Sequence, residues 1–157
     1  MPAPPDPPWP AVLLVDDDTM VLAATEITLE GARFRVTSCS SPKKARALIS
    51  ENDFDAVITD YKMPEMTGLE LLAECRRLRP HTQRVLLTAV LNPADAVEAI
   101  ASGLVYRFIA KPWLRNELVA TLRDAVERRR LILENAALKL ELARLKDRAV
   151  APAHPRN

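Results

Sequence analysis

Short apolar segments alternate with helical segments five times along the chain from Ala11 onward. The apolar segments are bounded by turn or acidic residues, which predicts strands at 11–15, 34–39, 54–59, 83–90 and 104–110. Helix-start dipeptides such as Ser41-Pro42 and Asn92-Pro93 lie between them. Strands that are each followed by a helix run parallel, with helices over both faces of the sheet. We therefore predict an α/β fold with a doubly wound five-stranded parallel sheet.

The composition limits the class of protein and its partners. Of the 157 residues, 48% are hydrophobic and 27% are charged, a balance typical of a soluble globular protein. The net charge of +1 favours neither nucleic acid nor a membrane surface as a partner. The sequence has no signal peptide and no stretch near the roughly 18 uncharged apolar residues of a membrane span, so we expect a cytoplasmic protein. Cys39 and Cys75 lie far from each other and from histidines, which predicts buried free thiols rather than a disulfide or a metal site.

Proline and heptad patterns divide the chain into four predicted segments. Residues 1–10 hold six of the thirteen prolines and lack the features of a signal peptide, so we expect a disordered leader. Residues 11–126 contain the predicted sheet and its helices. Residues 127–149 continue the last helix as a coiled coil, and residues 150–157 form a disordered tail or the start of a linker.

Ionisable and hydroxyl side chains follow the predicted strands at the points where the strands end. They are Asp16, Asp17 and Asp18 after the first strand, Asp60 after the third, Thr88 in the fourth and Lys111 after the fifth. These strand ends share one edge of a parallel sheet, where doubly wound folds place their binding sites. Clustered carboxylates repel each other, which favours a bound Mg²⁺ together with the lysine ammonium. An aspartate in such a cluster can form an aspartyl phosphate, although the DDD run also fits a helix N-cap.

Four motifs occur in the order, and at the strand ends, that one bacterial family uses. They are LLVDDD, ITDYKMPEMTGLELL, VLLTAV and FIAKPW. On these motifs the chain resembles the receiver domains of bacterial two-component response regulators over about residues 11–125. The resemblance implies a flavodoxin-like (CheY-like) fold in which Asp60 accepts a phosphoryl group from a sensor histidine kinase or a phosphotransfer protein. It implies no enzymatic activity beyond the receiver's own phosphotransfer and autodephosphorylation.

The resemblance also implies a role for each residue that would hold the metal. Asp17 and Asp60 would bind Mg²⁺ directly, and Asp16 would act mainly through a metal-bound water. The backbone carbonyl of Lys62 would complete the protein ligands. All of these are hard oxygen ligands, the type that Mg²⁺ prefers.

The residues that would respond to the phosphoryl group follow from the same resemblance. Thr88 and Lys111 would bind it, and the peptide bond before Pro112 would be cis. Phe108 occupies the position of the family's switch aromatic, three residues before the lysine. Thr88 would move toward the phosphate, and Phe108 would rotate inward into the space it leaves.

Two further positions bear on how long a phosphoryl group would last. Lys62 lies two residues after Asp60, and Val90 lies two residues after Thr88. Neither side chain can easily position a hydrolytic water as an acid or an amide would. We therefore expect a phosphoryl group that persists longer than in chemotaxis-type receivers.

The segment after Pro112 predicts one helix of about 35 residues, longer than the receiver needs. Its heptad pattern places at positions a and d the residues that we call the seam: Leu131, Asn135, Leu138, Leu142 and Leu145. Glu134 and Glu141 at g then face Lys139 and Lys146 at e of a parallel partner. A single asparagine at an a position fixes two strands in register. We predict a homodimeric coiled coil; the alternative is a single helix packed on its own domain.

Three other functions fit parts of the sequence less well. Arg128, Arg129 and Arg130 precede a leucine repeat as in a basic-region zipper, but acidic residues upstream argue against DNA binding. DDDTM resembles the nucleophile loop of haloacid-dehalogenase-like phosphatases, but Met20 stands where that loop has threonine or valine. A phosphorylation-independent binding or dimerisation module is the main alternative, and the intact set of Asp60, Thr88 and Lys111 argues against it.

The sequence does not identify an output domain. The segment GLVYRFIAKPW followed by a long helix resembles receivers that precede cyclic-dinucleotide phosphodiesterase, AAA+ activator or kinase modules. We expect either the N-terminal part of a larger regulator or a stand-alone receiver dimer. In both cases, phosphorylation would act through the long helix.

Overall fold

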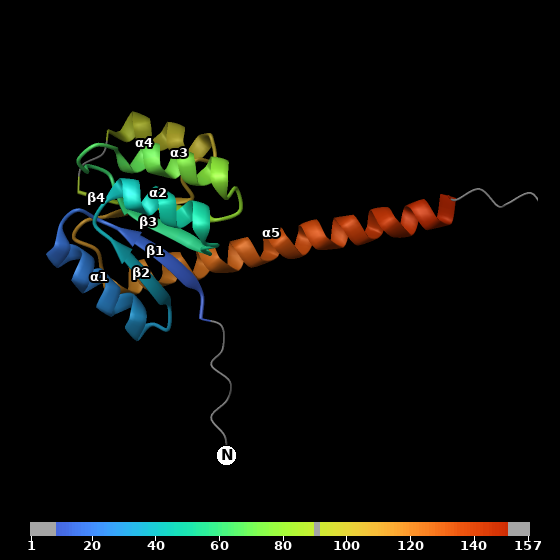
Figure 1. Ribbon diagram of the computed structural model, residues 1–157, viewed down its shortest axis with the longest axis horizontal. Coiled ribbons are helices and arrows are strands. Elements are labelled where there is room, and N and C mark those ends of the chain that lie inside the picture. The colour runs from blue at the N-terminus through green and yellow to red at the C-terminus, as the bar shows by residue number, and fades with distance from the viewer. Residues whose placement is uncertain (1–8, 90–91, 151–157) are drawn as a thin grey trace, which may run out of the picture.

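The structure is a computed structural model that describes residues 9–89 and 92–150. Its centre is a sheet of five parallel strands in the order β2-β1-β3-β4-β5 (Figure 1). The strands are β1 (Ala11–Val15), β2 (Arg35–Cys39), β3 (Ala56–Asp60), β4 (Gln83–Thr88) and β5 (Arg107–Ala110). The predicted doubly wound, flavodoxin-like sheet is confirmed.

A helix follows each strand, and the helices cover both faces of the sheet. They are α1 (Thr19–Gly31), α2 (Pro42–Glu51), α3 (Gly68–Leu78), α4 (Pro93–Ala101) and α5 (Arg115–Val150). One core cluster joins the sheet to α2, α3 and α4, and the other joins it to α1 and α5. Polar caps set the starts of α1 to α4, where the side chains of four residues accept bonds from backbone N–H groups: Asp18, Ser41, Thr67 and Asn92.

Strand β1 shows why the central strands appear as continuous apolar segments in the sequence. Leu13 and Val15 belong to the core cluster on one face of the sheet, and Val12 and Leu14 belong to the cluster on the other. Successive side chains of a strand point to opposite faces, and here helices cover both faces. The strand therefore has no polar side, and its end is marked by the aspartates that follow it.

Arg84 in β4 is a half-buried cation whose role the sequence pattern does not reveal. Its guanidinium donates hydrogen bonds of 2.7–3.2 Å to four backbone carbonyls. These carbonyls belong to Pro80, Thr82, Gly103 and Leu104, in the loops before β4 and β5. Burial lowers the pKa of this guanidinium. Arg84 thus ties together two loops at the amino edge of the sheet.

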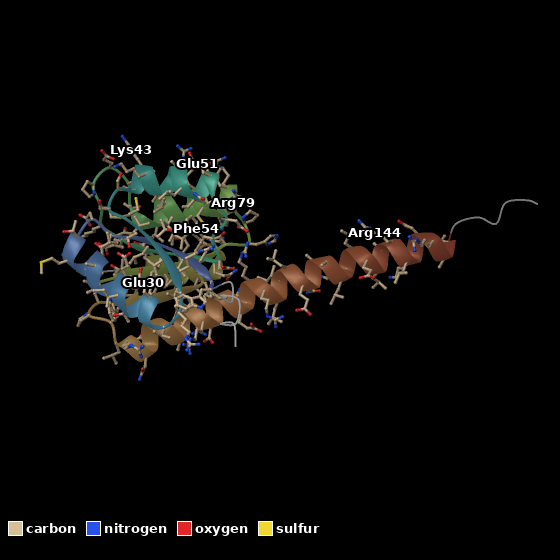
Figure 2. The ribbon with its side chains drawn as sticks, turned by 60° about the horizontal axis from the view of Figure 1, so that its bottom comes forward. Glu30, Lys43, Glu51, Phe54, Arg79 and Arg144 are labelled. Carbon is tan, nitrogen blue, oxygen red and sulfur yellow. The ribbon has the colours of Figure 1, made fainter. Side chains whose placement is uncertain are left out.

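Helix α5 leaves the domain partway along its length. Leu118, Leu122 and Ala125 are 0% exposed, whereas Leu131 is 50% and Leu138 is 59% exposed. Beyond about residue 132 the helix projects away from the rest of the described chain (Figures 1 and 2). The predicted continuous helix is confirmed, and the alternative in which all of it packs on its own domain is wrong. Pairing with a second copy stays a prediction.

Within residues 9–89 and 92–150, no helix combines the length and the apolar character that crossing a bilayer requires.

Candidate functional site

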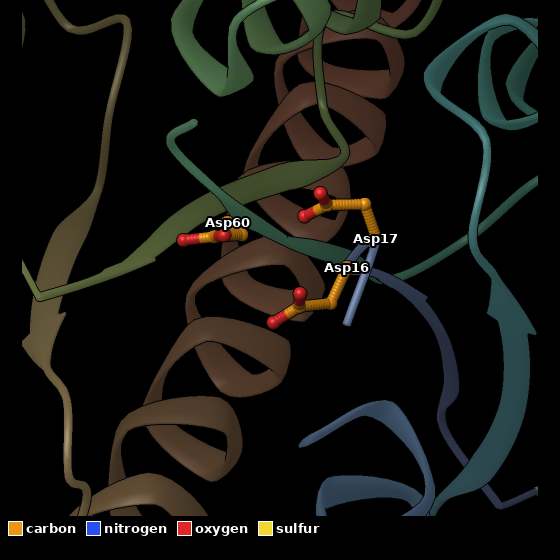
Figure 3. Close-up of side chains that lie close together, drawn as sticks. All are labelled: Asp16, Asp17 and Asp60. Atoms are coloured by element: carbon orange, nitrogen blue, oxygen red, sulfur yellow. The ribbon is translucent and has the colours of Figure 1, made fainter. Parts of the chain in front are cut away.

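The polar residues that follow the strands lie at the carboxyl edge of the sheet. Asp16 and Asp17 follow β1 directly, and Lys111 follows β5. Asp60 is the last residue of β3, and Thr88 is the last residue of β4. The strands β1, β3, β4 and β5 are neighbours in the sheet, so their ends bring these side chains to one place. Figure 3 shows the three carboxylates gathered there.

Lys111 is the cation that compensates the carboxylates. Its Nζ lies 2.7 Å from Oδ2 of Asp16 and 3.3 Å from Oδ1 of Asp60. The Asp16 side chain is only 2% exposed, and its Oδ1 accepts a hydrogen bond from the backbone N–H of Asp18. A buried carboxylate without such partners would be strongly disfavoured. Lys111 therefore makes it possible for the strand end to bury Asp16.

The environment shifts the pKa values of Asp60 and Lys111. Burial raises the pKa of the Asp60 carboxyl above its ordinary value of 3.8; the charge of Lys111 opposes this shift, and the charge of Asp16 adds to it. Burial lowers the pKa of Lys111, but hydrogen bonds and charges from Asp16 and Asp60 outweigh burial and hold this pKa above its ordinary value. The negative charge on Asp60 is thus incompletely compensated within the chain.

The carboxylates of Asp16, Asp17 and Asp60 fit a hard divalent cation. Each offers one oxygen, and the three oxygens lie within 4.8 Å of one another (Figure 3). Asp17 is exposed, so the cluster opens to water on that side. Mg²⁺ is held in proteins by one or two carboxylates and keeps several waters, which matches an oxygen-only cluster open to solvent. The residues present therefore fit the metal that the sequence suggests.

Gly68, the first residue of α3, lies directly against the backbone of Asp60. A Cβ at this position would overlap the carbonyl oxygen of Asp60 and lie 2.9 Å from Cδ1 of Leu86. The backbone N–H of Gly68 donates to the carbonyl of Tyr61 at 2.7 Å. This close approach needs a residue without a side chain. This role was not predicted from the sequence, where a lone glycine at a predicted helix start was the available sign.

The other expected residues occupy defined places in the structure. Thr88 is 8% exposed, and Phe108 is half-buried against the core cluster under α3 and α4. The Lys111–Pro112 peptide bond, for which the resemblance implied the cis isomer, is cis. Lys62 is exposed in the loop between β3 and α3. Val90 lies outside the described residues.

Asp18 serves the helix rather than the charge cluster. Its Oδ1 accepts hydrogen bonds from the backbone N–H groups of Met20 and Val21 at 3.0 and 3.3 Å. It is therefore the N-cap of α1. The interpretation of the DDD run as a cap is confirmed for its third member, while Asp16 and Asp17 belong to the cluster.

Comparison with known protein families agrees with this geometry. The family model for the response regulator receiver domain matches residues 12–123. The match covers most of the chain and includes all the strand-end residues of the cluster. The chain belongs to the response regulator receiver domain family.

The similar curated proteins are transcriptional regulators much longer than this chain. The C4-dicarboxylate transport transcriptional regulatory protein DctD of Rhizobium meliloti is 41% identical over 130 residues, covering 83% of this chain and 28% of that protein. The hydrogenase transcriptional regulatory protein HoxA of Cupriavidus necator is 35% identical over 131 residues, covering 83% and 27%. The chain thus spans little more than a quarter of these relatives.

Solved structures show the same fold. The crystal structure of adenylate cyclase from Rhodopirellula baltica has a TM-score of 0.78 and 30% identity, covering 83% of this chain and 96% of that chain. A CheY-like response regulator receiver domain protein from Methanospirillum hungatei has a TM-score of 0.73 and 26% identity, covering 78% and 97%. The expected CheY-like fold is confirmed.

The raised pKa of Asp60 predicts that this residue lowers stability when it is ionised. Protonation of Asp60 favours the folded state. Its contribution to the free energy of unfolding is therefore fully present below pH 3.8 and is lost as the pH rises through the raised folded-state pKa. Without divalent metal, Asp60→Asn should therefore melt at a higher temperature than the parent at neutral pH. The difference should shrink as the pH falls toward 3.8. Calorimetry over this range checks the prediction, and a difference that stays constant with pH would contradict it.

Proposed function

We propose that this receiver domain accepts a phosphoryl group on Asp60 from a sensor histidine kinase or a phosphotransfer protein, with Mg²⁺ as cofactor. The observation that carries the proposal is the position of Asp60 beside a fixed cation and two further carboxylates. Its side chain is 16% exposed, so a partner can reach it. Its Oδ1 accepts a hydrogen bond from the Tyr61 N–H, whereas Oδ2 accepts none from the described residues and is the proposed nucleophile.

Transfer would be a displacement at phosphorus. Oδ2 of Asp60 attacks the phosphorus of a phosphohistidine whose other ring nitrogen is protonated. A P–O bond forms, the P–N bond breaks, and the histidine leaves as neutral imidazole. Lys111 Nζ stabilises the charge on the phosphoryl oxygens, and the Thr88 hydroxyl donates to one of them. When bound by Asp17, Asp60 and the Lys62 carbonyl, with Asp16 acting through a water, Mg²⁺ supplies further neutralisation of that charge.

The proposed response passes from Thr88 to Phe108. Movement of Thr88 toward the phosphoryl group opens space beside β4, and Phe108, which pairs with Leu86 across β4 and β5, turns into it. Helix α5 begins four residues after Lys111, so a change at β5 reaches the long helix directly. We also propose a long-lived phosphoryl group, because the exposed Lys62 carries no group suited to positioning a hydrolytic water.

Intact mass spectrometry after incubation with Mg²⁺ and a small phosphodonor tests the acceptor. The parent should gain one phosphoryl group, and Asp60→Asn should gain none. Asp53→Asn, which changes an exposed aspartate at the opposite edge of the sheet, should behave like the parent. Phosphorylation of Asp60→Asn would contradict the assignment. A folded parent that takes no phosphoryl group would favour the alternative, a phosphorylation-independent binding or dimerisation module.

We further propose that residues 127–149 pair with the same segment of a second copy as a parallel coiled coil. The seam leucines are 50–59% exposed on a helix that the rest of the described chain does not cover. Exposed leucine rows of this kind mark protein interfaces. Asn135 fits the register-setting a position, and Glu134 would face Lys139 of the partner helix, as Glu141 would face Lys146.

The proposed division of the chain is a receiver domain at 11–126 followed by the dimerisation and signalling helix. Because the similar curated proteins are transcriptional regulatory proteins, we propose that the helix passes the receiver state to an output domain or partner that regulates transcription. The cytoplasm is the proposed location, since histidine kinases of two-component systems deliver phosphoryl groups there.

Two matched substitutions test the seam. Leu138 at position d and Leu140 at position f are 59% and 57% exposed, so their burial in the single chain is nearly the same. Leu138→Glu should weaken self-association by roughly a hundredfold, about 3 kcal/mol, because it buries a charge in the seam. Leu140→Glu should leave association almost unchanged. Sedimentation equilibrium measures both, and equal effects of the two changes would contradict the assigned seam.

A further inference from the structure

Helix α5 contacts the receiver domain again after its buried stretch, which runs from Leu118 to Ala125. Arg129 Nη2 lies 2.7 Å from Oδ2 of Asp53, and its Nη1 lies 2.8 Å from Oδ1 of Asp55. Both aspartates lie in the loop between α2 and β3, at the amino edge of the sheet. This edge is opposite the one that carries the acidic cluster. We call Arg129, Asp53 and Asp55 the α5 anchor.

Asp55 connects the anchor to the beginnings of three strands. Its Oδ2 accepts a hydrogen bond from the backbone N–H of Ala11 at 2.8 Å. Its own N–H donates to the carbonyl of Ala11 at 2.8 Å, and its carbonyl accepts from the N–H of Gln83 at 3.0 Å. These bonds fix Asp55 relative to β1, β3 and β4. Arg129 is therefore attached to the sheet itself.

The anchor differs in burial from the neighbouring charge pairs on α5. The Arg129 side chain is 14% exposed, whereas that of Arg130 is 59% exposed. Among the described residues, Arg130 pairs with Glu127 and Glu134 of its own helix. Exposed pairs within a helix contribute little, but a mostly buried arginine without its carboxylates would be an uncompensated charge. The Arg129 guanidinium therefore depends on the two aspartates, and its position is fixed by them.

The anchor and the seam lie on opposite sides of α5. Arg129 follows Leu122 by seven residues, close to two helical turns, so both side chains face the sheet. Leu131 follows Leu122 by nine residues, two and a half turns, so it faces away. The exposures agree, since Leu122 is 0% and Leu131 is 50% exposed. The rotation of the helix at Arg129 thus determines the direction in which the seam faces.

We propose that the α5 anchor makes the part of α5 after residue 126, here called the arm, rigid where it leaves the receiver domain and holds the seam turned away from that domain. Without the anchor, residues 127–134 would be held only by bonds within the helix, whereas most of the stability of a helix in a protein comes from its tertiary contacts. If the seam pairs with a second copy as proposed above, the two receiver domains would lie on the outer sides of the coiled coil. The rigidity of the arm depends neither on that pairing nor on phosphorylation of Asp60.

The test measures the distance between a spin label on the receiver domain and one on the arm. The labels are attached to Glu30→Cys on α1 and Arg144→Cys on the outer part of α5, two exposed positions (Figure 2). Cys39 and Cys75 are buried, and burial raises the pKa of the Cys75 thiol to about 11, so both resist labelling. Excess unlabelled protein ensures that a dimer contains one labelled copy.

The parent should give a single narrow distance distribution by double electron–electron resonance. Asp53→Asn and Arg129→Gln should lose it and give broad distributions, because the arm can then tilt and rotate. Arg130→Gln is the matched control and should keep the narrow distribution, since Arg130 pairs within α5. Distributions as narrow in Arg129→Gln as in Arg130→Gln would overturn the proposal.

Hydrogen exchange is a second measurement, and it distinguishes local loosening of α5 from loss of the whole fold. Among the described residues Asp53 pairs with Arg129 alone, so Asp53→Asn leaves the bonds between Asp55 and the strands in place. Amides of residues 127–134 should exchange faster in this variant, while those of the sheet keep their protection. Unchanged exchange at 127–134 would overturn the proposal.

Discussion

The ion pair between Lys111 and Asp16 is the contact on which the arrangement of the acidic cluster depends. It compensates a carboxylate that is almost completely buried where β1 ends, and the same ammonium lies 3.3 Å from Asp60. Burial raises the pKa of Asp60, and the charge of Asp16 adds to this shift against the opposing charge of Lys111, so Asp60 is harder to ionise than an exposed aspartate. The uncompensated negative charge of such a site favours binding of a divalent metal. With the metal and the fixed lysine in place, the site is suited to binding a phosphoryl group.

Helix α5 connects the two edges of the sheet. It begins four residues after Lys111, near the acidic cluster, and crosses the sheet to the amino edge, where Arg129 contacts Asp53 and Asp55 (Figure 1). The buried stretch from Leu118 to Ala125 lies between these ends. A helix held at both ends can transmit a rotation or a shift as one body. The seam lies on the far side of this helix, so a second copy that paired along it would lie away from the receiver domain.

The sequence predicts most of the fold because the strands and their ends carry clear patterns. β1 is apolar on both faces, and the aspartates begin directly where it stops. Asp60, the last residue of β3, and Lys111, directly after β5, mark the ends of these strands in a similar way. Since parallel strands end at one edge, chain positions far apart could be assigned to a single cluster. The continuous helix after residue 112 was equally predictable, because no proline or glycine interrupts it before residue 152.

The contacts that sequence patterns leave undetermined are those between side chains and distant backbone. Arg84 satisfies four carbonyls in two loops, and a lone arginine in an apolar strand gives no sign of them. Gly68 is needed because the Asp60 backbone approaches it, a distance that only the folded chain defines. In the sequence, Arg129 is only the middle of three consecutive arginines. Its partners lie 74 and 76 residues earlier, and the path of α5 across the sheet brings them together.

The most direct test of the account is the effect of Mg²⁺ on thermal stability when Asp17 is changed. Asp17 is exposed, and its side chain makes no hydrogen bond or ion pair with the described residues, so Asp17→Asn should leave the metal-free fold unchanged. Mg²⁺ at about a hundred times its dissociation constant should raise the melting temperature of the parent by roughly 5–10 °C. Asp18→Asn, which changes the helix cap, should respond to Mg²⁺ as the parent does, and Asp17→Asn should not. An equal rise in the parent and in Asp17→Asn would contradict the proposed metal site.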